Sequence, residues 1–472
     1  MNSMHRLSAA ICLTAIFAVD SVRAADWEVA PNDVAGTRKP AVLVDIDKLE
    51  RTAIDALKSQ ATGAGWWLEL GDTLLLAGDL GKVRSSAPGA RIRELGELAP
   101  EDLILHARGC GDSVLSPSLS LHTGLSYELM RRTASTQSAP AAHASHLGAA
   151  EWLAVVPNTV LAKRFEVESG TRLQPDPAIL PIVAAVSAPR WYADVEALAN
   201  FDRSSYSTEL PAARAYIVQQ FAALGLSIEE PEFQFTYYGN NIPQPATVSN
   251  VVGRWTGTRN PNDWIVVGGH YDSRNSVNTA PVATPGADDN ASGCSGVIEA
   301  ARALTRFRPQ STLIFMCYAG EEQGLHGSVA HVNALSQAGQ LGQVSRMVNM
   351  DMIGWSATAD IGVIIETNSA NAALMTELGN AGAIYAPEID VITDFVPCCT
   401  DLMPYLNAGR PAITSIHRGS AGAYPHYHRS TDVPVNLGPH SQAVGGAIIR
   451  MNVAALAQAS GASDVVFNDS YD

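Results

Sequence analysis

Short apolar runs that alternate with helix-like segments dominate the second half of the chain. Residues 264–269, 311–318 and 346–352 are mostly apolar runs of six to eight residues, a length typical of buried strands. Residues 211–224 and 290–307 place apolar side chains at the spacing of a helix face. Strands that alternate with helices predict an α/β fold, with a mostly parallel mixed sheet sandwiched by helices.

Composition excludes several classes of protein. The 472-residue chain has a formal net charge of −16, with 46% hydrophobic and 17% charged residues. So apolar a chain is not expected to be disordered. Its negative charge argues against a nucleic-acid partner, because phosphate groups would be repelled.

The chain divides into three predicted parts. Residues 26–132 alternate short strands with turns, including a hairpin that turns at Gly71-Asp72. Prolines gather between residues 172 and 189, where we place a domain start. The prediction is a signal peptide at 1–24, a smaller N-terminal α+β domain at 25–185, accessory or propeptide-like, and the main α/β domain at 186–465.

The first residues are typical of an export signal. His5 and Arg6 precede an uncharged apolar run at 7–19, and small residues lead to Ala24. The run is too short to span a membrane, and no later segment predicts a span. We therefore expect a periplasmic or extracellular protein. Five of the six cysteines follow the signal, an odd number, so at least one is expected to be free or intermolecular.

Imidazole and carboxylate groups lie at the ends of two of the predicted strands. His270 and Asp272 come directly after residues 264–269, and side chains two residues apart on an extended chain point the same way. His270 could therefore bind a metal while Asp272 fixes the orientation of its ring. Asp351 lies in the run 346–352, where an acid is costly unless it is paired or binds a metal.

Two pairs of adjacent acids lie between these strands. Asp288 and Asp289 stand where a loop meets a predicted helix, and Glu321 and Glu322 follow residues 311–318. Neighbouring side chains diverge, so one glutamate could bind a metal while the other acts as a general base. Taken singly, the first pair could simply cap the helix, and the second could be a solvated turn.

The last candidate pair is His428 with Asp432, four residues further on. Together, these sites predict two metal ions that share one carboxylate. Mixed imidazole and carboxylate ligands suit zinc in a catalytic site, and no thiolate set favours a softer metal. The predicted ligands are His270, Asp288 and Asp351 for one ion and Asp288, Glu322 and His428 for the other.

Five motifs carry a resemblance to a known family: His270-Tyr271-Asp272-Ser273, Gly286 to Gly293, Gly320 to Gly324, Asn349 to Met352, and His428 to Asp432. Over roughly residues 190–460 the chain resembles the secreted two-zinc aminopeptidases of metallopeptidase family twenty-eight, which are related to bacterial leucyl aminopeptidase. The resemblance implies the zinc-exopeptidase fold and two Zn²⁺ per subunit.

The resemblance also implies roles for matching residues. Asp288 would bridge the metals, Glu321 would be the base, and Glu322 and Asp351 would be terminal ligands. A cis peptide bond is implied at Asp288-Asp289. Three acids would support the ligands from behind: Asp272, Asp289 and Asp432.

The substrate pocket is where this sequence departs from the family. Leucyl-type relatives carry two cysteines a few residues apart beside the pocket, whereas Cys398 and Cys399 are adjacent. A disulfide between neighbours and two free thiols both remain open. Cys294 and Cys317 are expected to be small buried apolar residues. The pocket candidates are Met352, Cys398, Cys399, Tyr424 and Tyr427.

The sequence therefore predicts an exported zinc aminopeptidase that cleaves the N-terminal bond of peptides and favours apolar first residues. Glu321 would take a proton from a water activated by two metals. A carboxypeptidase or dipeptidase, a glutaminyl cyclase on the same scaffold, and a metal-free binding protein remain alternatives. The sequence carries no signal for an oligomeric state.

Overall fold

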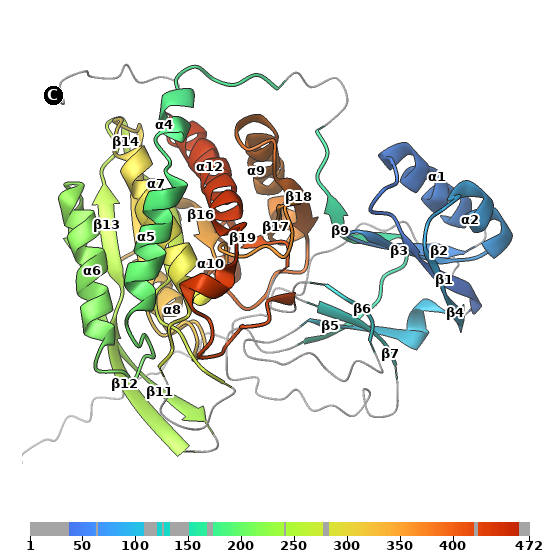
Figure 1. Cartoon of the computed structure of the whole chain (residues 1–472), viewed down its shortest axis with the longest axis horizontal. Helices are drawn as coiled ribbons and strands as arrows, with labels where there is room; N and C mark the ends of the chain where they lie inside the picture. The colour runs from blue at the N-terminus through green and yellow to red at the C-terminus, as the bar shows by residue number, and fades with distance from the viewer. Residues whose placement is uncertain are drawn as a thin grey trace, which may run out of the picture.

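One mixed sheet, 13-stranded in the described part of the chain, runs through the computed structural model with helices against it (Figure 1). This architecture confirms the predicted α/β fold. Among the described residues, no helix is both long and apolar enough to cross a membrane. The structure describes residues 37–62, 65–107, 120–124, 127–132, 151–167, 173–239, 242–276, 283–419 and 423–461.

Parallel strands form the centre of this sheet. They are β14 (Asn260–His270), β15 (Ser311–Tyr318), β16 (Val344–Met350) and β19 (Ala412–His417). β14 pairs in parallel with β15 and β16, and β16 pairs in parallel with β19. Their carboxyl ends therefore lie along one edge of the sheet. β16 ends before the predicted position 352, so Asp351 lies just beyond the strand.

Further strands extend the sheet on both sides. β13 (Val251–Trp255) pairs antiparallel with β15, and β10 (Ser227–Glu229) pairs antiparallel with β13. On the other side, β17 (Gly362–Glu366) pairs antiparallel with β19 and parallel with β18 (Asp390–Asp394). The sheet is therefore mixed, with its parallel part in the middle.

Helices bury both faces of the central strands. One face is covered by α5 (Ala188–Ala199), α6 (Leu210–Ala223), α7 (Gly293–Leu304), α9 (Ala372–Tyr385) and α12 (Ser441–Ala459), with the short α4 (Leu180–Ala184) at one end. The other face packs against α8 (His326–Gln337) and α10 (Leu402–Asn407). The helix predicted at 290–307 begins at Gly293, because the tight turn η2 (Ala287–Ser292) precedes it.

The N-terminal part continues the same sheet. After β18 come β9 (Thr159–Arg164), β2 (Trp66–Leu70), β3 (Thr73–Ala77), β1 (Lys39–Asp45) and β4 (Ile92–Leu98). Helices α1 (Arg51–Thr62) and α2 (Leu80–Ser86) pack on these strands. The predicted hairpin at Gly71-Asp72 joins β2 to β3, and Gly71 has a φ of 79° that suits glycine.

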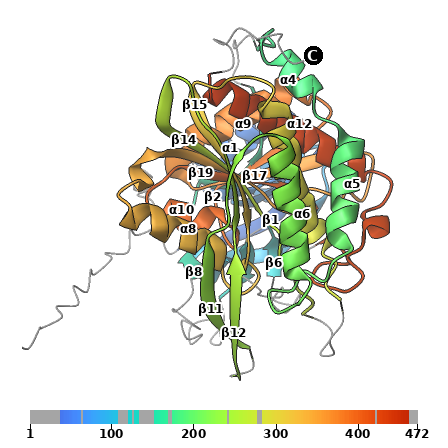
Figure 2. The ribbon, with the colours of Figure 1, turned by 90° about the vertical axis from the view of Figure 1, so that its left-hand side faces the viewer.

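Two smaller sheets complete the fold. β6 (Ser120–Thr123), β7 (Tyr127–Arg131), β5 (Leu103–Ala107) and β8 (Glu151–Ala154) form a four-stranded sheet in the N-terminal part. β11 (Glu232–Gly239) and β12 (Ile242–Ser249) form a ribbon that projects from the main body (Figure 2). Short helical turns lie at Pro100–Asp102, Leu341–Gln343, Ser369–Asn371 and Pro434–Leu437. The signal predicted at 1–24 lies outside the described residues.

Candidate metal centre

The first group of potential metal ligands lies at the carboxyl edge of the central strands. His270 is the last residue of β14, Glu321 follows β15, and Asp351 follows β16. His270 Nε2 lies 3.5 Å from Asp351 Oδ1 and 3.8 Å from Glu321 Oε2. All three side chains are buried, and their ligand atoms lie within 4.8 Å of one another. Parallel strand order thus gathers residues that are up to 81 positions apart (351 − 270).

A second group lies against the first. His428 Nε2 lies 2.9 Å from Asp289 Oδ2 and 3.2 Å from Glu322 Oε2. The three side chains are buried, and each offers one ligand atom within 4.8 Å of the others. They come from three loops, of which only the loop of Glu322 also serves the first group.

Asp289, a member of the second group, also reaches His270 of the first group, which corrects the predicted sharing of Asp288. Its Oδ1 lies 3.3 Å from His270 Nε2, while its Oδ2 faces His428. Asp288 turns the other way: its carboxylate accepts hydrogen bonds from the Gly354 amide at 2.8 Å and pairs with His417 Nε2 at 2.7 Å. Consecutive side chains in this turn diverge, so only one aspartate can point between the imidazoles. The non-proline cis bond is Asp289-Asn290, one position after the predicted one.

Two further acids hold the ligand loops through backbone groups. Asp272 accepts hydrogen bonds from the amides of Glu321 and Glu322, at 3.2 and 3.4 Å, and from Ser205 Oγ. Its own carbonyl oxygen lies 3.1 Å from His270 Nδ1. Asp272 therefore fixes the backbone of the loop that carries Glu321 and Glu322, and it also lies beside the imidazole of His270.

Asp432 holds the backbone of the aspartate turn, the turn η2 that carries Asp288 and Asp289, in the same way. It accepts hydrogen bonds from the amides of Asp288 and Asp289, at 2.9 and 3.1 Å. Tyr424, predicted as a pocket residue, donates its hydroxyl to Asp432 at 2.6 Å. Burial raises the pKa of Asp432 to about 7, and nearby Asp288 adds to this. Tyr424 is thus tied to the support of the turn.

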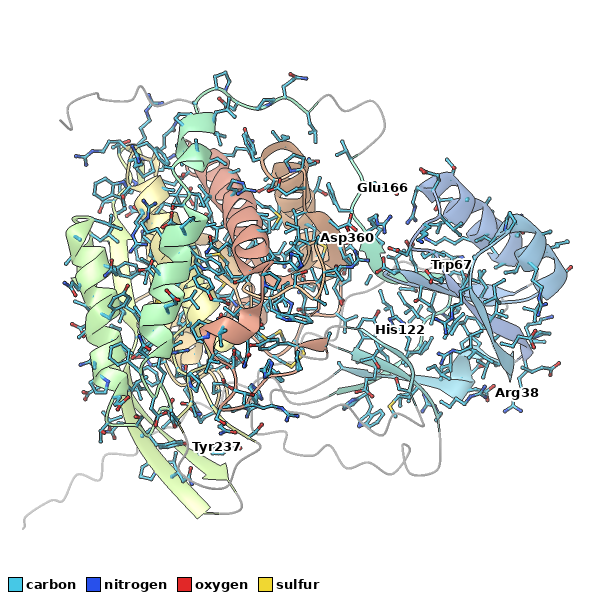
Figure 3. The ribbon with its side chains drawn as sticks, viewed as in Figure 1. Arg38, Trp67, His122, Glu166, Tyr237 and Asp360 are labelled. Atoms are coloured by element: carbon cyan, nitrogen blue, oxygen red, sulfur yellow. A yellow bond between two sulfur atoms is a disulfide. The ribbon has the colours of Figure 1, made fainter. Side chains whose placement is uncertain are left out.

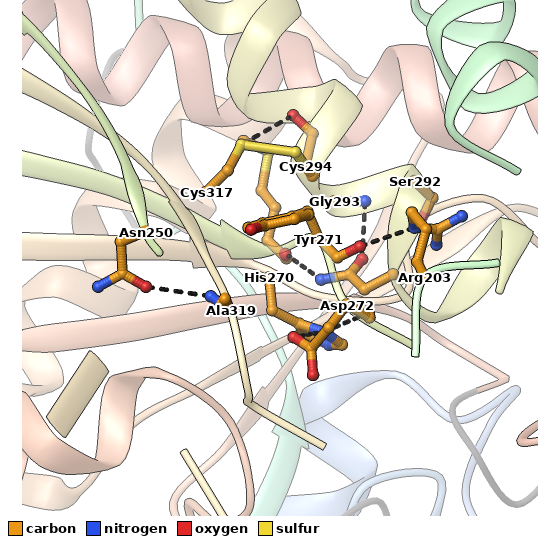
Figure 4. The surroundings of a disulfide bond; sticks show 12 residues. Arg203, Asn250, His270, Tyr271, Asp272, Ser292, Gly293, Cys294, Cys317 and Ala319 are labelled. Carbon is orange, nitrogen blue, oxygen red and sulfur yellow. Dashed lines mark hydrogen bonds and ion pairs between the residues drawn. A yellow bond between two sulfur atoms is a disulfide. The ribbon is translucent and has the colours of Figure 1, made fainter. Parts of the chain in front are cut away.

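Two arginines that sequence reasoning missed lie beside the acids. Arg274 Nε lies 2.9 Å from Glu322 Oε2, and its guanidinium also donates to His428. Arg203 is fully buried and donates to the carbonyl of Tyr271 (Figure 4). It also donates to the carbonyls of Leu198 and Gly286. Arg274 lies two residues after the His-x-Asp motif, and this position could have indicated that it lies near the site. No local pattern marks Arg203, which lies far upstream.

Burial and mutual charge shift the titration of the first group. Burial raises the pKa of Glu321 well above its ordinary range, although His270 opposes this rise. Burial alone would lower the pKa of His270, but the carboxylates of Glu321 and Asp351 outweigh it and raise that pKa. Asp351 also has a raised pKa because it is buried. The group therefore favours a bound cation or proton.

The shared carboxylate is the exception. Burial would raise the pKa of Asp289, but hydrogen bonds from His270 and His428 outweigh burial and lower it. Glu322 Oε1 is buried and has no hydrogen-bond partner among the described residues. Four carboxylates with two imidazoles, and one carboxylate oxygen without a partner, fit two divalent cations of the kind that nitrogen and oxygen ligands bind.

The remaining predicted residues lie around this cluster. Met352 is buried directly after Asp351, and the Tyr427 ring stacks on His428 with centroids 3.6 Å apart. Cys398 and Cys399 form a disulfide between neighbours, one of the two alternatives left open. Cys294 and Cys317 are buried in the core, as predicted, but they are not separate apolar side chains. They form a disulfide, because α7 and β15 bring their Cα atoms to 5.7 Å (Figure 4).

Comparison with known proteins agrees with this geometry. Residues 250–453 match the family model described as Peptidase family M28. A "Probable zinc metalloprotease" of Pyrenophora teres f. teres is 36% identical over 201 residues, which cover 40% of this chain and 41% of that protein. Another, from Leptosphaeria maculans, is 41% identical over 124 residues, or 26% and 28% of the two chains. The chain thus spans less than half the length of these curated relatives.

Solved structures are similar in fold. An aminopeptidase from Aneurinibacillus sp. strain AM-1 has a TM-score of 0.50 at 18% identity, over 62% of this chain and 98% of that one. The LapA aminopeptidase of Legionella pneumophila has a TM-score of 0.50 at 17% identity, over 76% and 98%. At these identities the likeness concerns the fold alone.

Proposed function

We propose that the protein is a zinc-dependent aminopeptidase that removes apolar residues from peptide N-termini. The match of residues 250–453 to the model of Peptidase family M28 supports this proposal. One observation carries the proposal: two groups of buried ligands meet at the shared carboxylate of Asp289. The name of the Pyrenophora relative, a probable zinc metalloprotease, supports the choice of metal.

The residues divide into ligands and a proton carrier. His270, Asp289 and Asp351 would hold one zinc ion, and Asp289, Glu322 and His428 the other. Bound zinc would polarise the substrate carbonyl and acidify the attacking water. Glu321 then remains free to take a proton from that water and pass it to the leaving amine.

The pairing of the nearby arginines argues against a carboxypeptidase. Arg274, the cation in contact with the acids of the centre, is already paired with Glu322. A carboxypeptidase needs a free cation for the terminal carboxylate. Arg418 is likewise already paired, with Asp390 at 2.8 Å and with Asp72.

A panel of substrates tests the proposal. Matched tripeptides with a free amine, a blocked amine, a blocked carboxyl group or an N-terminal glutamine are incubated with zinc-loaded and chelator-treated protein. The expected result is zinc-dependent release of the first residue, fastest for apolar residues, and no cleavage when the amine is blocked. Release from the carboxyl end, or cyclisation of glutamine without cleavage, would contradict aminopeptidase activity.

Export is part of the proposal. The apolar run at residues 7–19 and the disulfide Cys294–Cys317 support it, because disulfides persist mainly in oxidising compartments. Mass spectrometry of cell fractions should find the protein outside the cytoplasm, with a chain that begins at Ala25. A cytoplasmic protein that begins at Met1 would contradict export.

A further inference from the structure

The N-terminal part, meaning the described residues between 37 and 165, is joined to the metal-bearing part by backbone pairing. β9 pairs antiparallel with β18 and parallel with β2, so the sheet passes from one part to the other without a break. The Phe395 amide donates to the Leu161 carbonyl at 2.9 Å, and the Phe165 amide donates to the Val391 carbonyl at 2.7 Å. Removal of β9 would leave β18 as an open edge strand.

Apolar side chains cross the same junction. Val396, from the loop that carries Cys398 and Cys399, is buried in the core of the N-terminal part with Leu161. Phe165 packs on α9 so closely that a Cβ on Gly379 would collide with its ring. Figure 3 shows Glu166 at this junction, with Trp67 and His122 in the N-terminal part beyond it. The two parts therefore share buried surface at the loop that carries Cys398 and Cys399.

An ion cluster lies at the same junction. Arg418 pairs with Asp72 and Asp47 of the N-terminal part, and with Asp390 at the start of β18. Arg164 at the end of β9 pairs with Asp47 at 2.7 Å. The Arg418 side chain runs over Gly362, where a Cβ would approach its Cδ to 2.7 Å. The β1–α1 loop, the β2–β3 turn and the start of β18 thus meet at one guanidinium.

Arg418 stands next to a side chain that reaches the metal centre. His417, the preceding residue, is fully buried, and its Nε2 lies 2.7 Å from Asp288 Oδ2. Asp288 is followed by Asp289, the carboxylate that faces both His270 and His428. A continuous set of contacts therefore runs from Asp72 to Asp289.

We propose that the N-terminal part is a permanent component of the active enzyme, and that Arg418 is a positioning residue through which it fixes the shared carboxylate. The inference rests on the proposed function for its two-metal site. A removable propeptide would instead detach and leave the metal centre complete.

Cleavage of the intact chain tests permanence. A recognition sequence for a site-specific protease is inserted between Ser169 and Gly170, which lie between β9 and α4, and the folded protein is cut. We expect the two pieces to co-elute in native gel filtration, with unchanged zinc content, and to separate only in denaturant. Separation in native buffer, with a larger piece that keeps its zinc and its activity, would overturn the proposal.

Substitutions test the role of Arg418. Arg418→Met should weaken zinc binding by about threefold or more in competition with a chromophoric chelator, because outer contacts orient metal ligands, and should lower kcat more than it changes KM. Arg418→Lys should restore most of this loss. Arg450→Met is the matched control: Arg450 has a similar exposed fraction, 28% against 27%, and its partner is Glu388 rather than an acid of the N-terminal part.

Asp72→Asn provides a milder variant in case Arg418→Met does not fold, and should shift zinc affinity in the same direction. If the folded variants keep the zinc affinity and the kcat of the wild-type protein, Arg418 is not a positioning residue. If the wild-type protein itself binds no zinc, the proposed function fails instead, so the two failures are distinguishable.

Discussion

Two adjacent aspartates illustrate how much depends on a single residue position. Asp288 and Asp289 are difficult to distinguish from sequence alone, since they are adjacent acids directly before the predicted helix. In the structure, Asp289 faces His270 and His428, while Asp288 faces His417. The difference arises in the turn, whose backbone sends successive side chains to opposite sides.

The two aspartates should differ in metal binding. Asp289→Asn removes the carboxylate common to both ligand groups, so bound zinc should fall from two ions to one or none. Asp288→Asn should keep two ions with a modest loss of affinity, because it acts through the turn. Metal analysis after gel filtration measures this, and equal losses in the two variants would refute the reassignment.

Glu321 should be needed for turnover but not for metal content. Glu321→Gln keeps the size of the side chain and removes the base, so kcat should fall by at least about 100-fold with two zinc ions still bound. Glu322→Gln, its neighbour, should instead reduce zinc content. A Glu321→Gln protein with two zinc ions and near-normal turnover would show that another group takes the proton.

At the scale of elements, close packing between α7 and β16 holds the aspartate turn against the sheet. Gly293, the first residue of α7, lies where a Cβ would collide with the carbonyl oxygen of Met350 and with Asn290. Asn290 in turn bonds the Gly293 and Met352 amides. The glycine lets the helix begin directly beneath the ligands.

Gly293→Ala should therefore destabilise the protein by about 2 kcal/mol or more, because an overpacked site must shift its backbone. Gly342→Ala is the control, since a Cβ added at Gly342 would meet no atom within 4 Å, and it should change stability by less than about 0.5 kcal/mol. Urea unfolding of zinc-loaded protein measures both. Similar midpoints for the two variants would contradict the packing argument.

Helix α8 carries a pH-sensitive contact. His331 Nδ1 lies 2.6 Å from the hydroxyl of Tyr405 on α10, which lies 2.8 Å from the hydroxyl of Tyr318 on β15. Burial lowers the pKa of His331 to about 4, and Arg254 adds to this. The histidine therefore stays neutral in the folded protein at pH values where the unfolded chain is protonated.

The free energy of unfolding should consequently fall as the pH drops from about 6.5 to about 4. In that range His331 binds a proton in the unfolded state but stays neutral in the folded state. Urea unfolding of zinc-free protein at pH 7 and pH 5 measures the loss. His331→Gln should reduce the difference between the two pH values, whereas His440→Gln, a change at the start of α12, should not. An identical pH dependence in all three proteins would exclude His331 as a cause.

At the scale of the whole molecule, the metal centre concentrates negative charge in a buried place. Asp289, Glu321, Glu322 and Asp351 lie together with few cations, so the zinc-free protein carries a repulsive cost. Bound ions would remove that cost and join loops from several strands.

Zinc removal should therefore lower the unfolding temperature by several degrees. Ligand binding at 100 times its dissociation constant adds about 2.7 kcal/mol per site. Calorimetry with and without chelator measures the shift, and Asp289→Asn should show a much smaller one. If the unfolding temperature is the same with chelator and with added zinc, the folded state does not bind the metal.

Local pattern was enough to predict much of this protein. Apolar run length and helical spacing predicted β14, β15 and α6, since these signals depend only on neighbouring residues. The order of strands and helices predicted the fold class. The five metal-type motifs lie at strand ends and loop junctions, and their members do meet in the structure.

Tertiary structure alone decided the rest, because the deciding contacts join residues that are far apart in the sequence. It selected Asp289 over Asp288, through the path of one turn against His270 and His428. It brought Cys294 to Cys317 and placed buried Arg203 beneath the ligand loops. It also merged the N-terminal strands into the main sheet through β9 and β18, since strand pairing follows three-dimensional register rather than proximity in sequence.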